Sequence, residues 1–409
     1  MKKLIASAGL VAVGTASLHA VDSYYGLSRQ EASKPWSISA SLRGFYDDNF
    51  AAAPKSIRED SWGMEFSPAF ALNFPMEQTY VRVGYIYSLK YYFERDDDKA
   101  DHSHDFNVKA EHRFSERYKI ELSDSFVYAQ EPELIDETTQ TQFRTDSDVY
   151  RNRATVNFVA ELTELWSLLA GYQNIWYDYV QEGDFSRSAL LDRTEHLFRL
   201  DGRWQMQEHL IGLVGYQYGV NDYRSKNLIT SLVRGDDRDN TAHYVYLGAN
   251  YSFSSQLNGE ARAGVRSTDY DTGDDELSPY VDIAGTYTYL PGSYVQLGFR
   301  HDRNATDVAG SGADITTDQE TSSVFGSINH RITPQLNGRL ETQYQRGVFN
   351  GGPADGDLEN FFLAGVNLEY RINNNWAAET GYNYDRLDSD ASNRSFTRNR
   401  VYVGVRASY

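Results

Sequence analysis

Cysteine is absent from the 409-residue chain, and methionine and proline are scarce, with 4 and 9 residues. The lack of cysteine excludes disulfides, thiolate metal sites and cysteine nucleophiles. Long apolar runs are also missing after residue 20, because the best candidate, 80–89, is interrupted by Arg82, Gly84 and Ser88. A helical membrane protein is therefore excluded, since a spanning helix needs ~20 apolar residues.

Positive charge is also in short supply, with 39 Lys+Arg against 58 Asp+Glu and a net charge of −19. Nucleic acid is not expected as a partner, because phosphate binding needs a basic face. The nine long polar stretches described below together carry more negative charge than the whole chain. The rest of the chain is therefore close to neutral, and the acidity is expected to belong to external loops.

The first twenty residues have the layout of a secretory signal peptide. A basic start, Met1-Lys2-Lys3, precedes an apolar run over 4–13 and a stretch of small residues that ends at Ala20. We predict that residues 1–20 are removed on export and that 21–35 form a short periplasmic segment. Residues 36–409 then remain for a single folded unit.

What the chain does contain is aromatic residues, at 14% of its length, placed at alternate positions. Trp62, Met64, Phe66, Phe70 and Leu72 alternate with small or polar residues, and the same period of two recurs along the chain. Alternation of this kind predicts strands with one apolar and one polar face. Aromatic residues gather at the predicted strand ends, as in the interfacial girdles of membrane proteins.

Short and long connections alternate between these strands. Short turns are predicted near 75–78, 115–117, 162–165, 205–208, 254–256, 290–293, 333–335 and 373–375. Long polar loops are predicted near 47–60, 94–103, 131–148, 181–192, 221–240, 271–276, 303–320, 349–359 and 386–395. Eight turns and nine loops predict eighteen strands over 36–409, and sixteen strands is the alternative. Each predicted strand is long enough to cross a bilayer at a tilt.

These features predict an all-β fold: a transmembrane antiparallel up-and-down β-barrel with short periplasmic turns and long external loops. The competing interpretation is a soluble β-sandwich, propeller or β-helix. A soluble sheet has no reason to alternate short and long connections in this way, and no propeller-length repeat with fixed residues recurs. The barrel is therefore the interpretation that we prefer.

The last segment, 401–409, alternates Val401, Val403 and Val405 with polar or small residues and closes on Tyr409. It resembles the terminal signal that the barrel-assembly machinery reads in bacterial outer-membrane proteins. The chain as a whole resembles outer-membrane porins, and among them the putative beta-barrel porin-2 family. The resemblance implies a barrel in the outer membrane of a Gram-negative-type bacterium, in contact with lipid and lipopolysaccharide. A homo-oligomer stays open, because alternation alone cannot locate the flat strip of small residues that it needs.

The polar register of the strands predicts the inner wall. Charges of both signs there imply water inside, because unpaired charges in a dry interior are costly. The predicted pore-lining residues are Arg43, Arg82, Lys109, Arg113, Arg151, Arg153, Arg199, Arg203, Arg262, Arg266, Arg300, Arg339 and Glu341. Their basic excess predicts a weak preference for anions deep in the pore.

One loop is a candidate for a constriction inside the barrel. Segment 131–148 is acidic, and its predicted constriction residues are Glu131, Glu133, Asp136 and Glu137. Facing Arg151, Arg153 and Arg199, it would set a transverse field across the channel. A solvated surface loop is the alternative.

A few residues interrupt the alternation. Asp124 falls in an apolar register, where a carboxylate is costly in a bilayer, and we expect a β-bulge near Ser123 to re-aim it. His112, His196, His301 and His330 share the apolar register and are expected near strand ends.

The sequence contains few patterns that would indicate catalysis or metal binding. His102 and His104 are expected in the acidic loop 94–103, where they could bind a divalent cation, and a solvated loop is the simpler expectation. The acidic run 271–276 lacks the spacing of an EF-hand. No nucleophile-elbow motif occurs, so no enzyme, metal or cofactor is predicted.

The leading hypothesis is thus a porin whose water-filled channel passes small polar or charged solutes by passive diffusion. One alternative is a barrel that exports a surface polysaccharide or a specific ligand. Another is a structural or receptor barrel that acts through its external loops. The strand pattern fits all three, and it does not identify the solute.

Overall fold

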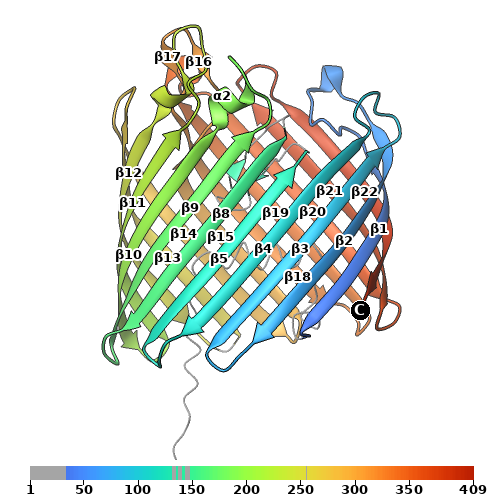
Figure 1. The fold of residues 1–409 in the computed structure, drawn as a ribbon, viewed down its shortest axis with the longest axis vertical. Coiled ribbons are helices and arrows are strands. Elements are labelled where there is room, and N and C mark those ends of the chain that lie inside the picture. Colours follow the sequence, from blue (N-terminus) through green and yellow to red (C-terminus); the bar gives the residue numbers. More distant parts are fainter. Residues whose placement is uncertain (1–33, 131–134, 137–140, 143–147, 255) are drawn as a thin grey trace, which may run out of the picture.

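Eighteen antiparallel strands form one sheet in the computed structural model (Figure 1). The structure describes residues 34–130, 135–136, 141–142, 148–254 and 256–409. The predicted signal peptide, 1–20, and most of the predicted periplasmic segment lie outside the described residues.

The wall strands follow one another around the sheet in chain order, each antiparallel to its neighbours. They are β1 (Trp36–Asp47), β2 (Ser61–Pro75), β3 (Thr79–Tyr92), β4 (Ala100–Arg113), β5 (Tyr118–Ala129), β8 (Val149–Glu161), β9 (Trp166–Tyr179), β10 (Arg193–Gln207), β11 (Leu210–Tyr223), β12 (Asn240–Ser252), β13 (Leu257–Tyr270), β14 (Glu276–Leu290), β15 (Ser293–Asn304), β18 (Asp318–Arg331), β19 (Leu336–Asn350), β20 (Leu358–Arg371), β21 (Trp376–Ser389) and β22 (Phe396–Ser408).

The remaining elements are short and lie in the loops. They are the ribbons β6 (Ile135–Asp136) with β7 (Thr141–Gln142) and β16 (Gly310–Ser311) with β17 (Asp314–Ile315), the helix α2 (Arg187–Leu191), and the 3-10 turns η2 (Lys55–Ile57), η3 (Gly235–Arg238) and η4 (Gly352–Ala354). No helix in the described part of the chain is long and apolar enough to cross a membrane.

The sheet closes on itself because β1 pairs with both β2 and β22, in a register that sets Ser39 opposite Ser408. Closure removes the free strand edges that would otherwise leave backbone groups unpaired in lipid. The expected eighteen-stranded barrel is therefore confirmed, and the sixteen-stranded alternative is not. The predicted order of short turns and long loops is confirmed as well.

The alternate side chains of each strand divide between two faces. On β2, for example, Trp62, Met64 and Phe66 are exposed, whereas Ser61 is buried on the opposite face. The exposed apolar set faces outward, as a wall in lipid requires. Aromatic pairs lie at strand ends on this outer face, such as Trp166 with Trp204, whose ring centres are 5.7 Å apart.

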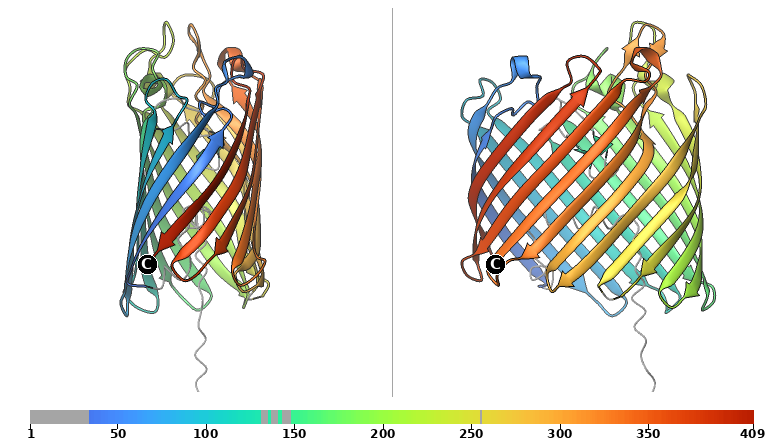
Figure 2. Two further views of the ribbon diagram at one scale, coloured as in Figure 1. Left: turned by 90° about the vertical axis from the view of Figure 1, so that its right-hand side faces the viewer. Right: turned by 180° about the vertical axis from the view of Figure 1, so that it is seen from behind.

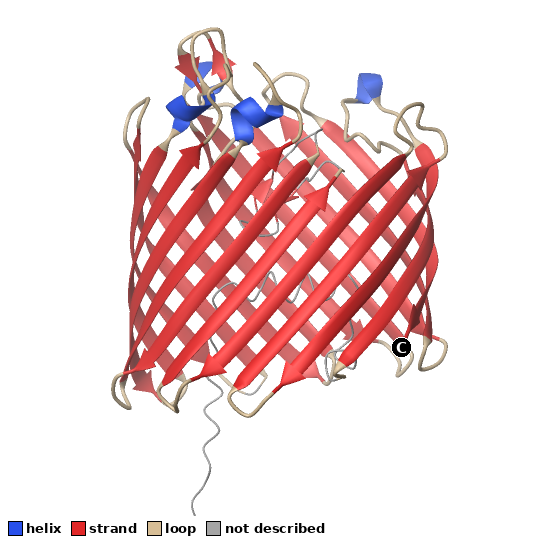
Figure 3. Ribbon diagram, viewed as in Figure 1, coloured by secondary structure: helices blue, strands red, loops and turns tan. Residues whose placement is uncertain are grey.

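The two ends of the barrel differ. The helices and the longer loops gather at one end, and tight turns and the C-terminus lie at the other (Figure 3). In barrels of this class the long loops are external. Turned by 90°, the barrel is much narrower, so its cross-section is oval (Figure 2). Two broad walls therefore face each other across a flattened interior.

The expected β-bulge at Ser123–Asp124 is wrong. The pairing of β5 with β4 and with β8 runs through Asp124 without a register shift. The carboxylate keeps its outward position, and its Oδ1 accepts a hydrogen bond from Asn152 Nδ2 on β8 at 3.1 Å. A polar partner on the same face compensates the carboxylate, so the strand does not need to bend. Register shifts occur instead at Gln205–Gln207 and Thr288–Leu290, beside short turns.

Candidate channel wall and external mouth

The inner face of the wall is rich in ion pairs. Arg43 of β1 contacts Glu379 of β21 at 2.7 Å and Glu65 of β2 at 3.7 Å, so one guanidinium links three strands across the closure of the barrel. Arg406 Nη2 lies 2.7 Å from Glu369 Oε2 on β20. These pairs satisfy charges that a barrel wall could not otherwise carry.

Many of the other pairs join residues two positions apart on one strand. Lys119 Nζ lies 2.6 Å from Glu121, Arg262 Nη2 lies 3.2 Å from Glu260, and Arg339 Nη2 lies 3.1 Å from Glu341. Because side chains at i and i+2 share a face of a strand, a basic and an acidic residue at this spacing can pair locally. This spacing is a sequence signal for an inner wall that the apolar alternation alone does not give.

All the predicted pore-lining residues lie on the strand faces opposite the exposed apolar side chains. They are not equally accessible, because Lys109 and Arg113 are exposed, whereas Arg151, Arg203 and Arg262 are buried. Arg82 and Arg153 are half-buried. The part that these residues play in solute passage stays a prediction.

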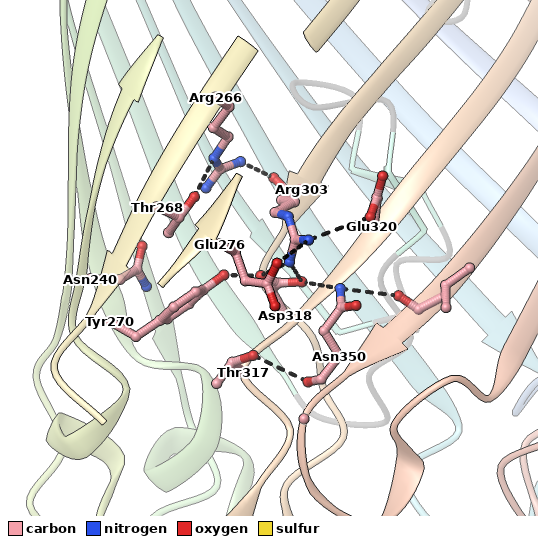
Figure 4. A network of polar contacts seen from close by, with 12 residues as sticks. Asn240, Arg266, Thr268, Tyr270, Glu276, Arg303, Thr317, Asp318, Glu320 and Asn350 are labelled. Atoms are coloured by element: carbon pink, nitrogen blue, oxygen red, sulfur yellow. Dashed lines mark hydrogen bonds and ion pairs between the residues drawn. The ribbon is translucent and has the colours of Figure 1, made fainter. Parts of the chain in front are cut away.

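Arg266 belongs to a polar network where two strands separate (Figure 4), and Arg300 contacts one of its carboxylates, Asp302. The pairing of β14 with β15 stops at Val281 and His301, so the external ends of these strands are not bonded to each other. Arg266 Nη1 and Arg300 Nη2 reach Asp302 at 3.0 and 3.7 Å. Arg266 Nε also donates to Thr268 Oγ1 at 2.9 Å, so its guanidinium fastens the wall.

Arg303 and Asp318 form the other half of this network, and sequence reasoning missed them. Arg303 contacts Asp318 at 3.0 Å and Glu276 at 3.1 Å, and Asp318 also accepts hydrogen bonds from Tyr270 and Asn350. Both charged residues were expected in the polar loop 303–320. No periodic signal places them in a gap between strands, because the gap exists only in the folded sheet.

Three external loops pack together at the mouth, and we call them the loop cap: residues 180–192, 224–239 and 305–317. Helix α2 lies in the first loop and places Leu190 and Leu191 against the inner face of β8 and β9. Ile229 and Ile315 from the other two loops complete this small apolar core. The loops therefore fold inward as a unit and narrow the external mouth.

Buried arginines hold the loop cap together. Arg238, which is 2% exposed, donates to the carbonyl oxygens of Leu190 at 2.9 Å and Thr306 at 3.0 Å, so it joins all three loops. Arg394, from the loop between β21 and β22, reaches Asp307 of the cap at 2.8 Å and Glu359 at 2.8 Å. The cap is thus fastened across the mouth to the strands near the barrel closure.

Two carboxylates of the loop cap have raised pKa values. Burial raises the pKa of Asp192, although Ser188 and the Tyr179 N–H hydrogen-bond to its carboxylate. The pKa of Asp239 is raised to about 6, and burial is the largest cause. A hydrogen bond from the Tyr223 N–H lowers this pKa, but burial together with the carboxylates that face Asp239 outweighs it. The facing carboxylates are Asp222 of β11, Asp271 of the loop after β13, and Asp236 of η3.

Burial would lower the pKa of Arg394, yet the carboxylates of Asp307 and Glu359 more than offset it and raise that pKa. The guanidinium therefore stays charged over any accessible pH. Only a change at the Asp307 carboxylate can therefore break its ion pair with Arg394.

Most of the predicted constriction residues fall outside the part of the chain that the structure describes. Glu131, Glu133 and Glu137 lie outside the described residues, and Asp136 is described only as part of the backbone ribbon β6. A constriction by segment 131–148 therefore stays a prediction. The loop cap is the narrowing that the described part of the chain contains.

His102 and His104 were expected in a loop and are instead part of β4, with their rings on the outer face. Their Nδ1 atoms lie 2.7 and 2.9 Å from the hydroxyls of Tyr87 and Tyr85. His196 forms the same contact with Tyr172 at 2.8 Å, near a strand end as expected. The strand residues provide tyrosine partners for these imidazoles, so the divalent-cation role is withdrawn.

The described residues contain no group of three or more His, Cys, Asp or Glu side chains arranged to hold a metal ion. The acidic run 271–276, which lies within the described part of the chain, thus provides no such ligand cluster. The chemistry of the wall is that of ion pairs and hydrogen bonds.

A closed sheet with an apolar outer face and an ion-paired inner face defines a transmembrane β-barrel of the channel class. The sequence matches the model of the family "Putative beta-barrel porin 2" over residues 37–409, and the chain belongs to this family. No curated protein matches the sequence.

Several solved structures resemble this chain at low sequence identity. OccAB4 of Acinetobacter baumannii is 11% identical, with 92% of this chain and 99% of that chain covered and a TM-score of 0.45. OpdK of Pseudomonas aeruginosa, solved with vanillate, is 13% identical, with 91% and 99% covered and a TM-score of 0.44. The siderophore receptor PirA of the same species is 11% identical, with 91% and 80% covered and a TM-score of 0.41. Scores this low leave the family assignment to rest on the sequence match.

Proposed function

We propose that this protein is an outer-membrane porin whose water-filled channel lets small polar or charged solutes diffuse, with a weak preference for anions. The observation that carries the proposal is the inner face, where charged side chains such as Arg43, Glu379 and Arg406 line a closed wall. A wall that was sealed and dry would not carry so many charges. The porin family supports the same function.

The anion preference follows from where the charges lie. Basic residues slightly outnumber acidic ones on the inner register, whereas the external loops hold the acidic excess. Charges in exposed loops are screened by salt over ~10 Å at 0.1 M ionic strength, and charges in a low-dielectric wall are screened less. The wall therefore dominates selectivity in salt solution.

The test is a planar bilayer recording of purified, refolded protein. We expect stepwise conductance and, in a potassium chloride gradient, a reversal potential that reports a modest excess of chloride permeability. Protein denatured before addition serves as the control. A silent barrel would refute the porin, and strong cation selectivity would refute the anion preference.

Export and assembly are part of the proposal. We infer that residues 1–20 are cleaved after Ala20, that 21–35 stay in the periplasm, and that Tyr409 is read by the barrel-assembly machinery. Tyr409 is 65% exposed beside Trp36, so it is accessible for such recognition. N-terminal sequencing of protein from outer membranes tests the cleavage, and deletion of Tyr409 is expected to lower the yield of folded barrel there.

The loop cap supports a second candidate function, in which the external loops act as a receptor or structural surface. Loops that served only as connections would not need a shared core with buried Arg238. Shortening 224–239 would then abolish the receptor activity without changing the number of strands. If the same change only raises conductance, the cap serves the channel.

A homo-oligomer is supported by a strip of small residues on the outer face of β11–β14. Gly212, Ala249 and Ala261 lie side by side in register, with Gly259 and Gly285 in the next row. Cross-linking in native outer membranes tests it, and an Ala261→Trp variant should then shift the oligomer to monomer. Lipopolysaccharide is expected to contact the rest of the outer face.

A further inference from the structure

Every histidine of the described wall strands faces outward, away from the channel. Each one shares its register with exposed apolar side chains such as Phe106, Phe198 and Leu297. The seven residues are His102, His104, His112, His196, His243, His301 and His330. Water in a channel would solvate an imidazole, so a placement only on the lipid side needs a different partner.

All seven imidazoles are held in the same way. In each case Nδ1 lies 2.7–2.9 Å from a hydroxyl oxygen on another strand, which belongs to tyrosine in five of the seven. A phenol is a good donor and the unprotonated ring nitrogen is a good acceptor. With the hydroxyl donating, the proton of the neutral ring lies on Nε2. Each ring therefore has a second N–H donor at its other nitrogen.

These second donors are accessible on β4. Nε2 of His102 and of His104 has no partner in the described part of the chain, and both atoms are open to the surroundings of the barrel. His301 differs, because its Nε2 lies 2.9 Å from Glu320 Oε1. His102 and His104 thus offer two unused donors on the outer face, whereas His301 offers none.

The two imidazoles belong to one aromatic ledge near the external rim. The Tyr87 ring centre lies 6.0 Å from that of His102 and 5.1 Å from that of His104, and Tyr128 of β5 lies 6.0 Å from His104. Phe106 continues the same face toward the middle of the membrane. A strand of 14 residues tilted by ~45° rises roughly 30 Å, and the apolar band of a barrel is ~25 Å tall. His102, two residues from the end of β4, therefore lies at the level of the lipid head groups.

The charges around the ledge lie mostly on its external side. The outward positions of β2, β3 and β4 hold no Asp, Glu, Lys or Arg, and on β5 only Asp124 does, two outward positions below Tyr128. Asp148 accepts a hydrogen bond from the Tyr128 hydroxyl at 3.1 Å. Beyond the strand ends, the loop between β3 and β4 carries three aspartates at 96–98 beside Lys99. An anion on the ledge would repel these carboxylates unless Mg²⁺ bridges them, as it does between carboxylates and phosphates.

We propose that His102 and His104 bind, through their Nε2–H groups, the phosphate of a lipid in the external leaflet. A hydrogen bond to an ionised phosphate is stronger than one to a neutral carbonyl. The tyrosine hydroxyls fix both rings before lipid binds, which lowers the entropy cost of binding. Phe106 then provides an apolar surface for the acyl chains below the phosphate. The inference goes beyond the porin function, because it requires the outer-membrane location and not conductance.

The first test follows the imidazoles directly. Protein labelled with ¹⁵N at histidine is held in maltoside micelles with Mg²⁺ and titrated with diphosphoryl lipid A. The resonances of His102 and His104 should show the Nε2–H tautomer and should shift as lipid is added, while that of His301 stays. Unchanged resonances for His102 and His104 would overturn the proposal. The same shifts with inorganic phosphate at equal concentration would also overturn it, because the site would then not select a lipid.

The second test measures the lipid A that the barrel retains in native mass spectrometry. The double change His102→Phe and His104→Phe keeps the aromatic ledge and suits a lipid-facing wall. It should weaken binding about tenfold, the effect of losing one hydrogen bond to a charged group. His301→Phe is the matched control, because it removes an outward imidazole whose Nε2 is already used. The heat-dependent gel shift of folded barrels shows whether each variant has folded.

Dephosphorylated lipid A identifies the acceptor. The wild-type barrel should bind it about as weakly as the double variant binds diphosphoryl lipid A. If the double variant loses affinity equally for both lipids, phosphate is not the acceptor and the proposal fails. A conducting barrel that shows no lipid response overturns this inference alone, whereas a silent barrel that binds lipid A overturns only the porin function. The wild-type titration decides the inference even if a variant does not fold.

Discussion

The ion pair between Asp307 and Arg394 holds the loop cap closed, and the effect of removing it on cap opening can be estimated. Asp307 is 6% exposed at its side chain and lies 2.8 Å from Arg394 and 3.7 Å from Arg187. Asp307→Asn keeps the shape of the side chain and removes its charge. A hydrogen bond between charged groups contributes about 1.5–3 kcal/mol, and Arg394 keeps its second partner, Glu359. We therefore expect a loss at the low end, about 1.5 kcal/mol, which opens the cap roughly tenfold more often.

Thiol labelling measures that opening, because the chain has no cysteine of its own. Ile229→Cys places one thiol in the core of the cap, where the wild-type side chain is 5% exposed. A membrane-impermeant maleimide reaches this position only when the cap opens. Where closing is faster than labelling, the rate follows the open population. The Asp307→Asn change should then raise the labelling rate of Ile229→Cys about tenfold.

Two controls isolate the cause. Leu232→Cys is in the same loop at a position that is 70% exposed, so its labelling should not respond to Asp307→Asn. Asp388→Asn removes an exposed carboxylate at the end of β21, outside the cap, and should leave the labelling of Ile229→Cys unchanged. An Ile229→Cys rate that stays within twofold in the Asp307→Asn protein would refute the fastening.

Further predictions concern the wall and the cap. Asp124→Leu replaces an outward carboxylate and should raise the free energy of unfolding in lipid vesicles by about 1 kcal/mol; a lower value in urea titrations would contradict the outward placement. Lowering the pH from 7 to 5 should slow maleimide labelling of the buried Ile229→Cys thiol relative to the exposed Leu232→Cys thiol. The closed cap holds the Asp239 proton more tightly than the open loops do, with a pKa of about 6, so its stability rises as pH falls through that value. If the ratio of the two labelling rates does not vary with pH, protonation of Asp239 does not stabilise the closed cap. Gly215→Ala should cost about 1–3 kcal/mol by overpacking, because its Cβ would lie 2.2 Å from the Tyr246 ring, and unchanged thermal unfolding of the barrel on gels would count against that contact.

Much of the wall could be predicted from local sequence alone. Each strand meets lipid on one face by itself, so the alternation of Trp62, Met64 and Phe66 with polar residues carries its own information. Turn positions follow in the same way, since each short polar break lies between two such runs. The number of strands can therefore be predicted without knowing any contact between distant residues.

Asp124 shows where residue-by-residue rules fail. A carboxylate in an apolar register suggests a bulge when it is considered alone, yet Asn152 on the next strand supplies a hydrogen bond. That partner is 28 positions away in sequence, and the register that brings it close is known only from the folded sheet. The tyrosine partners of His102 and His104 were missed for the same reason.

The loop cap is even harder to predict from the sequence than these contacts within the wall. Arg238 contacts Leu190 and Thr306 across separations of 48 and 68 residues, and none of these loops has a periodic pattern. Their composition alone indicates solvated connections. What brings them together is the oval wall, which sets loops from its two broad sides close enough to share a core.

The acidic composition and the basic wall act at different places and do not conflict. Carboxylates in exposed loops meet a salt solution in which charges more than ~10 Å apart are screened at 0.1 M, so they attract counterions without selecting what passes. The arginines of the inner face, such as Arg203 and Arg262, lie in the wall, where the effective dielectric constant is lower and each charge acts more strongly. A net charge of −19 is therefore compatible with a channel that prefers anions. The anion preference that we propose therefore follows from the small basic excess of the inner wall.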